Sequence, residues 1–146
     1  MTGMSTSDLP AALAEIREDF LETSEADSLL LLLEFADELP PVSEEVANHP
    51  EMCERVAECQ SPVYIYVEVN DGVVTMHASA PEEAPTTRAF ASILVQGITG
   101  LTPDEVLAIP DDYPQSIGLT KAVSPLRIGG MTGMLMRAKK QVRQKR

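Results

Sequence analysis

The chain has 146 residues, which is the length of one ordinary domain and is enough for a single hydrophobic core. Hydrophobic residues make up 44% and charged residues 23%, a balance that is typical of globular proteins and excludes overall disorder. The formal net charge is -12, whereas binding to a phosphate backbone needs a basic face. We therefore expect a single domain over residues 1–146 that has no nucleic-acid partner.

The charge is divided unevenly along the chain. All 23 acidic residues lie at or before Asp112, whereas six of the 11 lysines and arginines lie within residues 137–146. Cations stabilise the C-terminal end of a helix through its dipole, so we interpret this stretch mainly as a solvated basic helix end. Docking of a partner is the alternative.

The N-terminal part is expected to form two helices. An amphipathic pattern starts at Leu9 and reaches Phe20 at helical spacing. A second helix is predicted from Ala26 to Leu39, with the leucines of 29–33 and Phe35 facing the core, because prolines follow it directly. Five leucines are too few to span a bilayer, so no membrane association is expected.

A β-hairpin is predicted near the middle of the chain. Residues 42–58 are acidic and poorly periodic, which indicates a loop with short helical pieces. Pro62 to Val69 is rich in β-branched and aromatic residues and should form a strand. Asn70-Asp71-Gly72 is typical of a hairpin turn, after which Val73 to Ser79 is the returning strand.

Three further helices are expected after the hairpin. The first runs from Pro85 to Gly97, and a short one starts at Thr102, which forms a capping box with Glu105. The last begins at Ser124-Pro125. Its core-facing residues are predicted to be Leu126, Met131, Met134, Leu135, Ala138 and Val142, and Gly129, Gly130 and Gly133 are predicted at points of close approach. Helices that flank a hairpin favour an α+β fold with a small antiparallel sheet packed against several helices.

Several chemistries lack the residues that they require. The glycines at 129–133 lack the lysine directly after them and the strand before them that a phosphate loop requires, and no nucleophile elbow is present. A solvent-facing side chain is the default expectation for His49 and His77, and His77, in the middle of a predicted strand, is left without an assigned role. A zinc site of His49, Cys53 and Cys59 would lack a fourth ligand, and two thiols alone cannot hold an iron–sulfur cluster. No metal site is therefore expected.

The two cysteines carry the remaining chemical signal. No secretion signal precedes them, so we expect reduced thiols and a cytoplasmic location. Free cysteine is most often a small buried hydrophobe, and Cys53 is interpreted in that way. Cys59 lies instead at the end of a polar segment, directly before Gln60, Ser61 and the predicted strand.

Around Cys59 the chain resembles a known family, SufE. The resemblance rests on Cys59-Gln60-Ser61 before a strand and hairpin, on a helix that holds Arg88, and on Ser124-Pro125-Leu126-Arg127 followed by Gly130-Met131. It covers the order of elements from Leu9 to Met136. It implies a SufE/IscU-like fold and an accessory protein that is not itself an enzyme. Such a protein accepts persulfide sulfur from a cysteine desulfurase, which it activates, and relays that sulfur to iron–sulfur cluster assembly.

The resemblance also implies site residues and partners. Cys59 is the persulfide acceptor, and Arg88 and Arg127 are supporting basic residues, since a nearby arginine favours the reactive thiolate. The partners are a SufS-like desulfurase, which uses pyridoxal phosphate, and a SufBCD-like scaffold, while the chain itself needs no cofactor. Alternatives are another sulfurtransferase as donor, delivery outside cluster assembly, or a binding module without sulfur chemistry.

The residue before the acceptor departs from the family pattern. Glu58 stands where the family usually has glycine. A carboxylate next to a thiol disfavours the thiolate, and a side chain at this position restricts the turn. We therefore expect Cys59 to be activated only when a partner has moved the loop.

Overall fold

The structure is a computed structural model, and it describes residues 9–119 and 122–146. Its elements in chain order are α2 (Ala11–Glu22), α3 (Glu25–Asp37), α4 (Glu44–Ala47), the 3₁₀ helix η1 (Pro50–Met52), β1 (Glu54–Arg55), β2 (Tyr64–Asn70), β3 (Val73–Ser79), α5 (Pro85–Ile98), α6 (Pro103–Leu107), α7 (Tyr113–Ser116) and α8 (Pro125–Lys145). The α+β class with a small antiparallel sheet is confirmed. Within the described part of the chain, no helix combines the length and the apolar character needed to cross a membrane.

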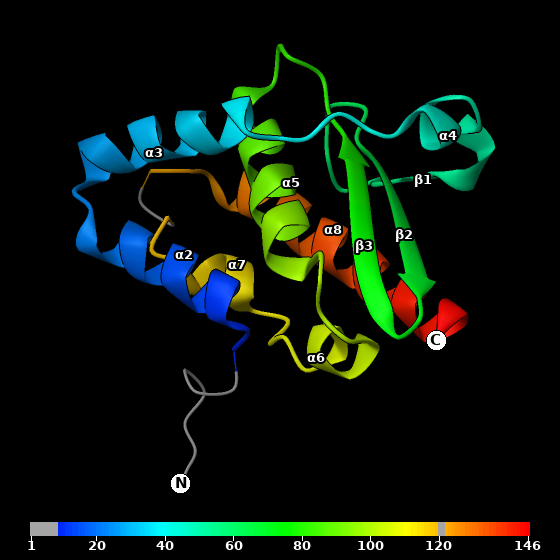
Figure 1. The fold of residues 1–146 in the computed structure, drawn as a ribbon. Coiled ribbons are helices and arrows are strands. Elements are labelled where there is room, and N and C mark those ends of the chain that lie inside the picture. The colour runs from blue at the N-terminus through cyan, green and yellow to red at the C-terminus, as the bar shows by residue number, and fades with distance from the viewer. Residues whose placement is uncertain (1–8, 120–121) are drawn as a thin grey trace, which may run out of the picture.

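The elements form three layers (Figure 1). A sheet of order β1-β2-β3 lies on one side, and α5 and α8 pack against it, α5 beside β3 and α8 beside β2. On the side of α5 that faces away from the sheet lie α2 and α3. The core lies between these layers, and Cys59 belongs to the buried cluster.

The hairpin forms where it is predicted. Strands β2 and β3 pair from Tyr64↔Ser79 to Asn70↔Val73. The two turn residues, Asp71 and Gly72, both have positive φ, which is the conformation of a type I′ turn. Alternation buries one face of each strand and leaves the other, which carries His77, only partly covered. His77, which had no assigned role, is only partly exposed and contacts Glu68, with Nε2 2.6 Å from the carboxylate.

A third strand was not predicted. β1 pairs with only two residues of β2, Glu54↔Ile65 and Arg55↔Tyr64. Beyond this pairing, side chains of α8 continue along the edge: the Gln141 amide accepts from the backbone N–H of Val67 at 2.7 Å and donates to the Ile65 carbonyl at 3.3 Å. A two-residue strand has no periodicity of its own, which explains why the pattern missed it.

Two predictions of core-facing residues were wrong. In α3, Leu32 and Phe35 are buried, but Leu29, Leu30 and Leu33 are largely exposed, because only one face of this outer helix meets α5. Leu126 in the first turn of α8 is 58% exposed, whereas the other residues predicted to face inward from this helix are buried.

The basic helix end is not simply solvated. Lys139 is only 3% exposed, and its ammonium lies 2.7 Å from the Asp111 carboxylate. Lys140 pairs with Glu54, and Arg146 lies 3.3 Å from Asp104. These contacts tie α8 to acidic residues from earlier parts of the chain, so the basic residues belong to the folded body.

Candidate functional site

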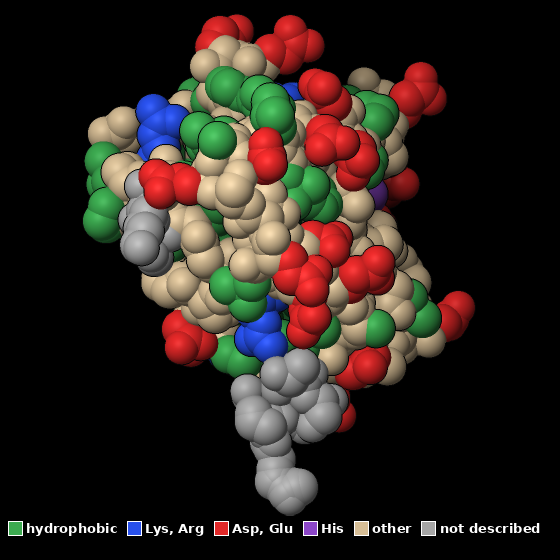
Figure 2. All heavy atoms as spheres, turned by 90° about the vertical axis from the view of Figure 1, so that its left-hand side faces the viewer, with side chains coloured by type: hydrophobic (Ala, Val, Ile, Leu, Met, Phe, Trp, Pro, Cys, Tyr) green, Lys and Arg blue, Asp and Glu red, His purple; other side chains and the backbone are tan. Residues whose placement is uncertain are grey.

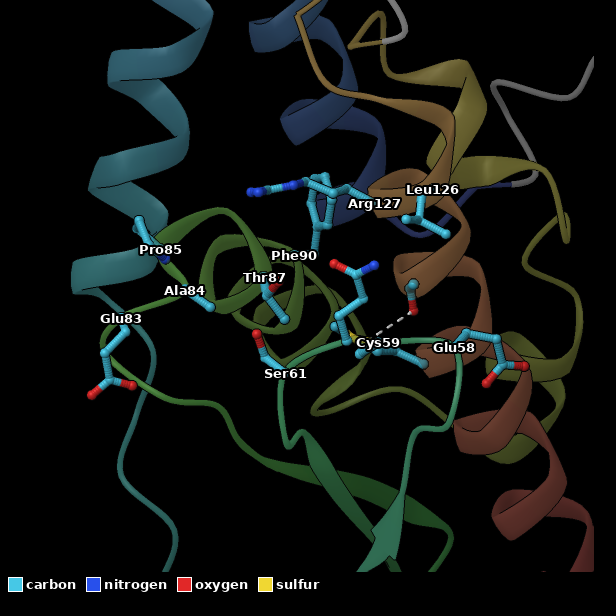
Figure 3. Close-up of a pocket in the computed structure, with 13 residues that line it drawn as sticks. Glu58, Cys59, Ser61, Glu83, Ala84, Pro85, Thr87, Phe90, Leu126 and Arg127 are labelled. Atoms are coloured by element: carbon cyan, nitrogen blue, oxygen red, sulfur yellow. Dashed lines mark hydrogen bonds between the residues drawn. The ribbon is translucent and has the colours of Figure 1, made fainter.

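Cys59 lies on the loop that connects β1 and β2. Residues 56–63 form this loop, and its base is closed by a hydrogen bond from the Val56 N–H to the Val63 carbonyl at 2.9 Å. The N–H of Cys59 donates to the Val56 carbonyl at 3.1 Å, which makes a tight turn at the tip. The turn brings the Cys59 thiol against the first half of α8 (Figure 3).

The thiol is seated over a glycine of α8. Cys59 is 8% exposed, and its Sγ lies 3.8 Å from the Gly130 carbonyl oxygen. A Cβ added at Gly130 would lie 3.1 Å from this Sγ, a separation that forces the neighbouring atoms to shift. Gly130 is therefore a point of close approach, as predicted. Gly133 is another, because a Cβ there would lie 2.8 Å from the Glu58 side chain, whereas a Cβ at Gly129 would meet open space.

A cavity of about 150 Å³ opens beside the thiol. Its walls come from the loop, from the start of α5 and from the first turns of α8, and they include Ser61, Thr87, Leu126 and Arg127. One water molecule occupies about 30 Å³ in the liquid, so the cavity can accept an additional sulfur atom on Cys59. The site combines a nucleophile with space for a small transferred group.

The structure brings one of the two predicted arginines to this site. Arg127 lines the cavity, although in Figure 3 its guanidinium points away from the Cys59 sulfur. Arg88 is not among the described residues that line it. Its Nη1 donates to the Ala80 carbonyl at 2.7 Å instead, and its side chain borders separate hollows near Leu33 and Pro40.

A third arginine, Arg137 of α8, was missed. Its Nη1 lies 2.6 Å from Glu58 Oε1 and donates to the Gly133 carbonyl at 3.3 Å. The spacing of Gly130, Gly133 and Arg137 places all three on one face of a helix, and this signal in the sequence could have identified it. The sequence analysis had instead grouped Arg137 with the basic helix end.

Burial and nearby charges set the state of the thiol. Burial is the largest influence and raises the pKa of Cys59, the neighbouring Glu58 carboxylate raises it further, and Arg137 opposes both. The hydrogen bond from Arg137 in turn lowers the pKa of Glu58. In this arrangement Cys59 is a protonated, sheltered thiol at neutral pH.

The other cysteine and the histidines lie elsewhere. Cys53 is partly buried beside Val46 and Tyr64, and burial followed by the charge of Glu51 raises its pKa. His49 is exposed and pairs with Glu51. In residues 9–119 and 122–146 no three His, Cys, Asp or Glu side chains gather in a way that could hold a metal ion.

Comparisons with known proteins place this arrangement in context. A family model described as "SufE: Fe-S metabolism associated domain" matches residues 14–142. An uncharacterized SufE-like protein of Mycobacterium tuberculosis is 47% identical over 137 residues, which are 93% of this chain and 94% of that protein. A SufE-like protein of Synechocystis is 31% identical over 87% of this chain and 77% of its own length.

A more distant relative and a solved structure agree with these matches. The relative, named "Cysteine desulfuration protein SufE" in Plasmodium vivax, is 26% identical over 68% of this chain and 39% of its own length. The solution structure of a hypothetical protein from Thermus thermophilus superposes with a TM-score of 0.83 and 34% identity, covering 93% of this chain and 96% of the other.

Proposed function

Because this chain belongs to the SufE family, which is associated with Fe–S metabolism, we propose that it is a sulfur-transfer accessory protein whose Cys59 accepts persulfide sulfur from a cysteine desulfurase and relays it to iron–sulfur cluster assembly. The observation that carries the proposal is the position of Cys59, at the tip of a closed loop beside a cavity large enough for one more sulfur atom. Cys53 has neither the loop tip nor this cavity.

The proposed step exchanges one S–S bond for another. The Cys59 thiolate attacks the terminal sulfur of the donor's cysteine persulfide, a bond forms between Sγ and that sulfur, and the S–S bond of the donor breaks. The donor cysteine leaves as a thiolate and takes up the proton that Cys59 has lost. The step needs no external oxidant or reductant, so the chain can act as a carrier.

The donor in this proposal is a desulfurase that uses pyridoxal phosphate, and the recipient is an iron–sulfur assembly scaffold. Arg127 is proposed to favour the Cys59 thiolate when the loop opens, since it lines the cavity from α8. Arg88 has a weaker claim to a direct role, because its guanidinium bonds to the Ala80 carbonyl.

The first test is sulfur acceptance by single-cysteine variants. The full chain is incubated with a SufS-type desulfurase and cysteine, and its intact mass and peptides are measured under non-reducing conditions. We expect the gain of one sulfur atom in the wild type and in Cys53→Ser, and no gain in Cys59→Ser, because only Cys59 lies at the loop tip. A urea unfolding curve of each variant controls for folding.

Persulfide on Cys53 in the Cys59→Ser protein would contradict the assignment of the acceptor. Absence of sulfur on either cysteine, together with binding to the desulfurase, would favour a binding module without sulfur chemistry. Sulfur taken only from a rhodanese-type donor would replace the desulfurase with another sulfurtransferase.

A further inference from the structure

Arg137 joins the loop of Cys59 to α8 through a charge pair. Its Nη1 lies 2.6 Å from Glu58 Oε1 and also donates to the Gly133 carbonyl of its own helix, which fixes the direction of the guanidinium. The Arg137 side chain is 20% exposed and that of Glu58 is 48% exposed. The pair is therefore partly shielded from water. Its carboxylate belongs to Glu58, the residue directly before the acceptor Cys59.

The helix surface under Glu58 is shaped to admit its side chain. A Cβ at Gly133 would lie 2.8 Å from Glu58 Cδ, 2.9 Å from Oε1 and 3.0 Å from Cβ. Any larger residue at position 133 would displace the carboxylate from its place beside Arg137. The space at Gly133 and the ion pair thus concern the same contact of the Glu58 side chain with α8.

We propose that Arg137 is a positioning residue for sulfur acceptance: through its ion pair with Glu58 across Gly133 it holds the Cys59 loop closed on α8, and a docked partner must break this pair to expose the thiol. This inference rests on one part of the proposed function, namely that Cys59 reacts with a partner. The contact itself belongs to the free protein.

The closed position both shelters the thiol and keeps it unreactive. The charges that act on Cys59 are Glu58 on its own loop and Arg137 on α8, while Arg127 of α8 and Glu83 of the segment before α5 line the same cavity. When the loop moves outward, the carboxylate of Glu58 leaves its partner and the thiol leaves its apolar surroundings. Attack on the donor persulfide then follows as described above.

Arg137 has a second carboxylate within reach. Its buried Nε has no hydrogen-bond partner in the described part of the chain and lies 3.7 Å from Glu54 Oε2. Glu54 is anchored on β1 by Lys140 and Gln141, so it stays in place when the loop moves. Arg137 therefore remains near a negative charge in the open state, which lowers the free energy required for opening.

The decisive variant changes no charge. Gly133→Ala displaces the Glu58 side chain, and Gly129→Ala is its matched control, because a Cβ at Gly129 meets no atom within 4 Å. Both substitutions replace glycine within α8 and have similar effects on helix propensity. In a Cys53→Ser background, alkylation of Cys59 by iodoacetamide is followed without any desulfurase, at a pH high enough for the rate to have levelled off.

We expect the limiting alkylation rate of Gly133→Ala to rise about two- to fivefold, in the range of a partly exposed ion pair, and that of Gly129→Ala to stay at the parent value. Equal rates in the two glycine variants would overturn the proposal. Circular dichroism at the same pH confirms that each variant remains folded.

A second pair of variants separates closure of the loop from electrostatics. Glu58→Gln removes the carboxylate and should lower the midpoint of the alkylation–pH curve, while Arg137→Gln should raise it. If the ion pair holds the loop closed, the limiting alkylation rate of Cys59 should nevertheless rise in both Glu58→Gln and Arg137→Gln. Arg137→Lys keeps the positive charge and should have a slow rate again. Midpoint shifts with unchanged limiting rates would show that Arg137 acts on the thiol only through its charge.

Sulfur uptake from a desulfurase is measured separately on the same proteins. Faster alkylation of the free Gly133→Ala protein supports closure of the loop by the Glu58–Arg137 pair, even if the protein accepts no sulfur. Failure to accept sulfur would count only against the proposed function. Normal sulfur acceptance with no change in alkylation would refute only the closure of the loop by this pair.

Discussion

At the scale of single residues, burial disfavours the thiolate form of Cys59, which is the form that acts as a nucleophile. A thiolate attacks a persulfide, yet in the closed loop burial and Glu58 raise the pKa of the thiol, so the protonated form dominates at neutral pH. The raised pKa of Cys53 shows that burial alone does not distinguish the two thiols. What distinguishes Cys59 is its place at the tip of a loop, beside a cavity.

The role of Arg127 is testable at this scale. Arg127 is exposed in the first turn of α8, where a cation is mildly unfavourable to the helix dipole, so a functional reason for its presence is expected. We predict that Arg127→Ala raises the pKa of Cys59 and slows sulfur acceptance about tenfold, the effect of one charge-assisted contact, with little change in the urea midpoint. Alkylation as a function of pH and persulfide formation over time measure the two effects.

Arg88→Ala is the comparison for this experiment, because Arg88 bonds to the Ala80 carbonyl and not within the Cys59 cavity. An alkylation–pH curve of Arg127→Ala that coincides with the wild type would remove Arg127 from the set of groups that stabilise the thiolate.

At the scale of elements, one buried hydroxyl joins helices far apart in the sequence. Tyr113 of α7 is 1% exposed, and its hydroxyl donates to the Leu13 carbonyl of α2 at 2.7 Å. We predict that Tyr113→Phe lowers the free energy of unfolding by about 1 kcal/mol, the usual contribution of a buried hydrogen bond. Urea unfolding at pH 7 measures this loss.

The contribution of the Tyr113 hydroxyl to the free energy of unfolding should also depend on pH. Burial raises the pKa of Tyr113, so above the ordinary value of about 10 the unfolded chain loses this proton while the folded chain keeps it. The stability that the hydroxyl contributes is therefore complete below that pH and is lost as the pH rises. The difference between wild type and Tyr113→Phe should shrink above about pH 10, and a constant difference would contradict this account.

The elements also show what the sequence could predict. The capping box at Thr102 and Glu105, the hairpin turn and the serine that caps α8 are local signals, and each is present in the structure. The leucines of α3 were assigned to the core as a run, although a helix in an outer layer buries only one face. α7 was not predicted because it is short and has no side-chain cap.

The same distinction holds for the site. Cys59 was singled out by the local pattern around it, and Gly130 and Gly133 were predicted as points of close approach, but not as neighbours of the Cys59 loop. The partner of Glu58 depends on how the loop folds over α8, which brings together residues far apart in the chain. Helical spacing places Arg137 on the face of Gly130 and Gly133, but its pairing with Glu58 depends on the fold of the loop.

At the scale of the whole molecule, the uneven charge is compensated within the fold. Figure 2 shows a face on which carboxylates greatly outnumber basic side chains. Cations of α8 meet acidic residues of β1, α6 and the segment before α7, at Glu54, Asp104 and Asp111. The C-terminal half of α8 therefore supplies basic side chains that pair with acidic residues of three other segments.

Removal of residues 137–146 tests this view. The deletion takes away six positive charges, the buried Ala138 and Val142, and the Gln141 amide that bonds to β2. We predict that the shortened chain loses cooperative unfolding, because two buried apolar side chains and a buried hydrogen-bonding group together contribute about 4–6 kcal/mol, a large part of typical domain stability. Circular dichroism during a urea titration would report this loss.

A charge-only control separates packing from electrostatics. Lys140→Gln, Arg143→Gln and Arg146→Gln combined change exposed side chains, so the unfolding free energy should fall by no more than about 2 kcal/mol. A shortened chain as stable as this triple variant would show that the helix end is a dispensable tail.

The amide of Gln141 has a consequence for how this protein behaves in a crowded solution. A sheet edge with free N–H and C=O groups invites strands from other molecules. Here the edge of β2 beyond the short β1 is occupied by Gln141 and Lys145. On the opposite side, β3 exchanges backbone hydrogen bonds with Gly100 and Leu101. Two helix side chains and a loop thus cover these edge groups, so that the loop opening that we propose would leave them protected from pairing with strands of other molecules.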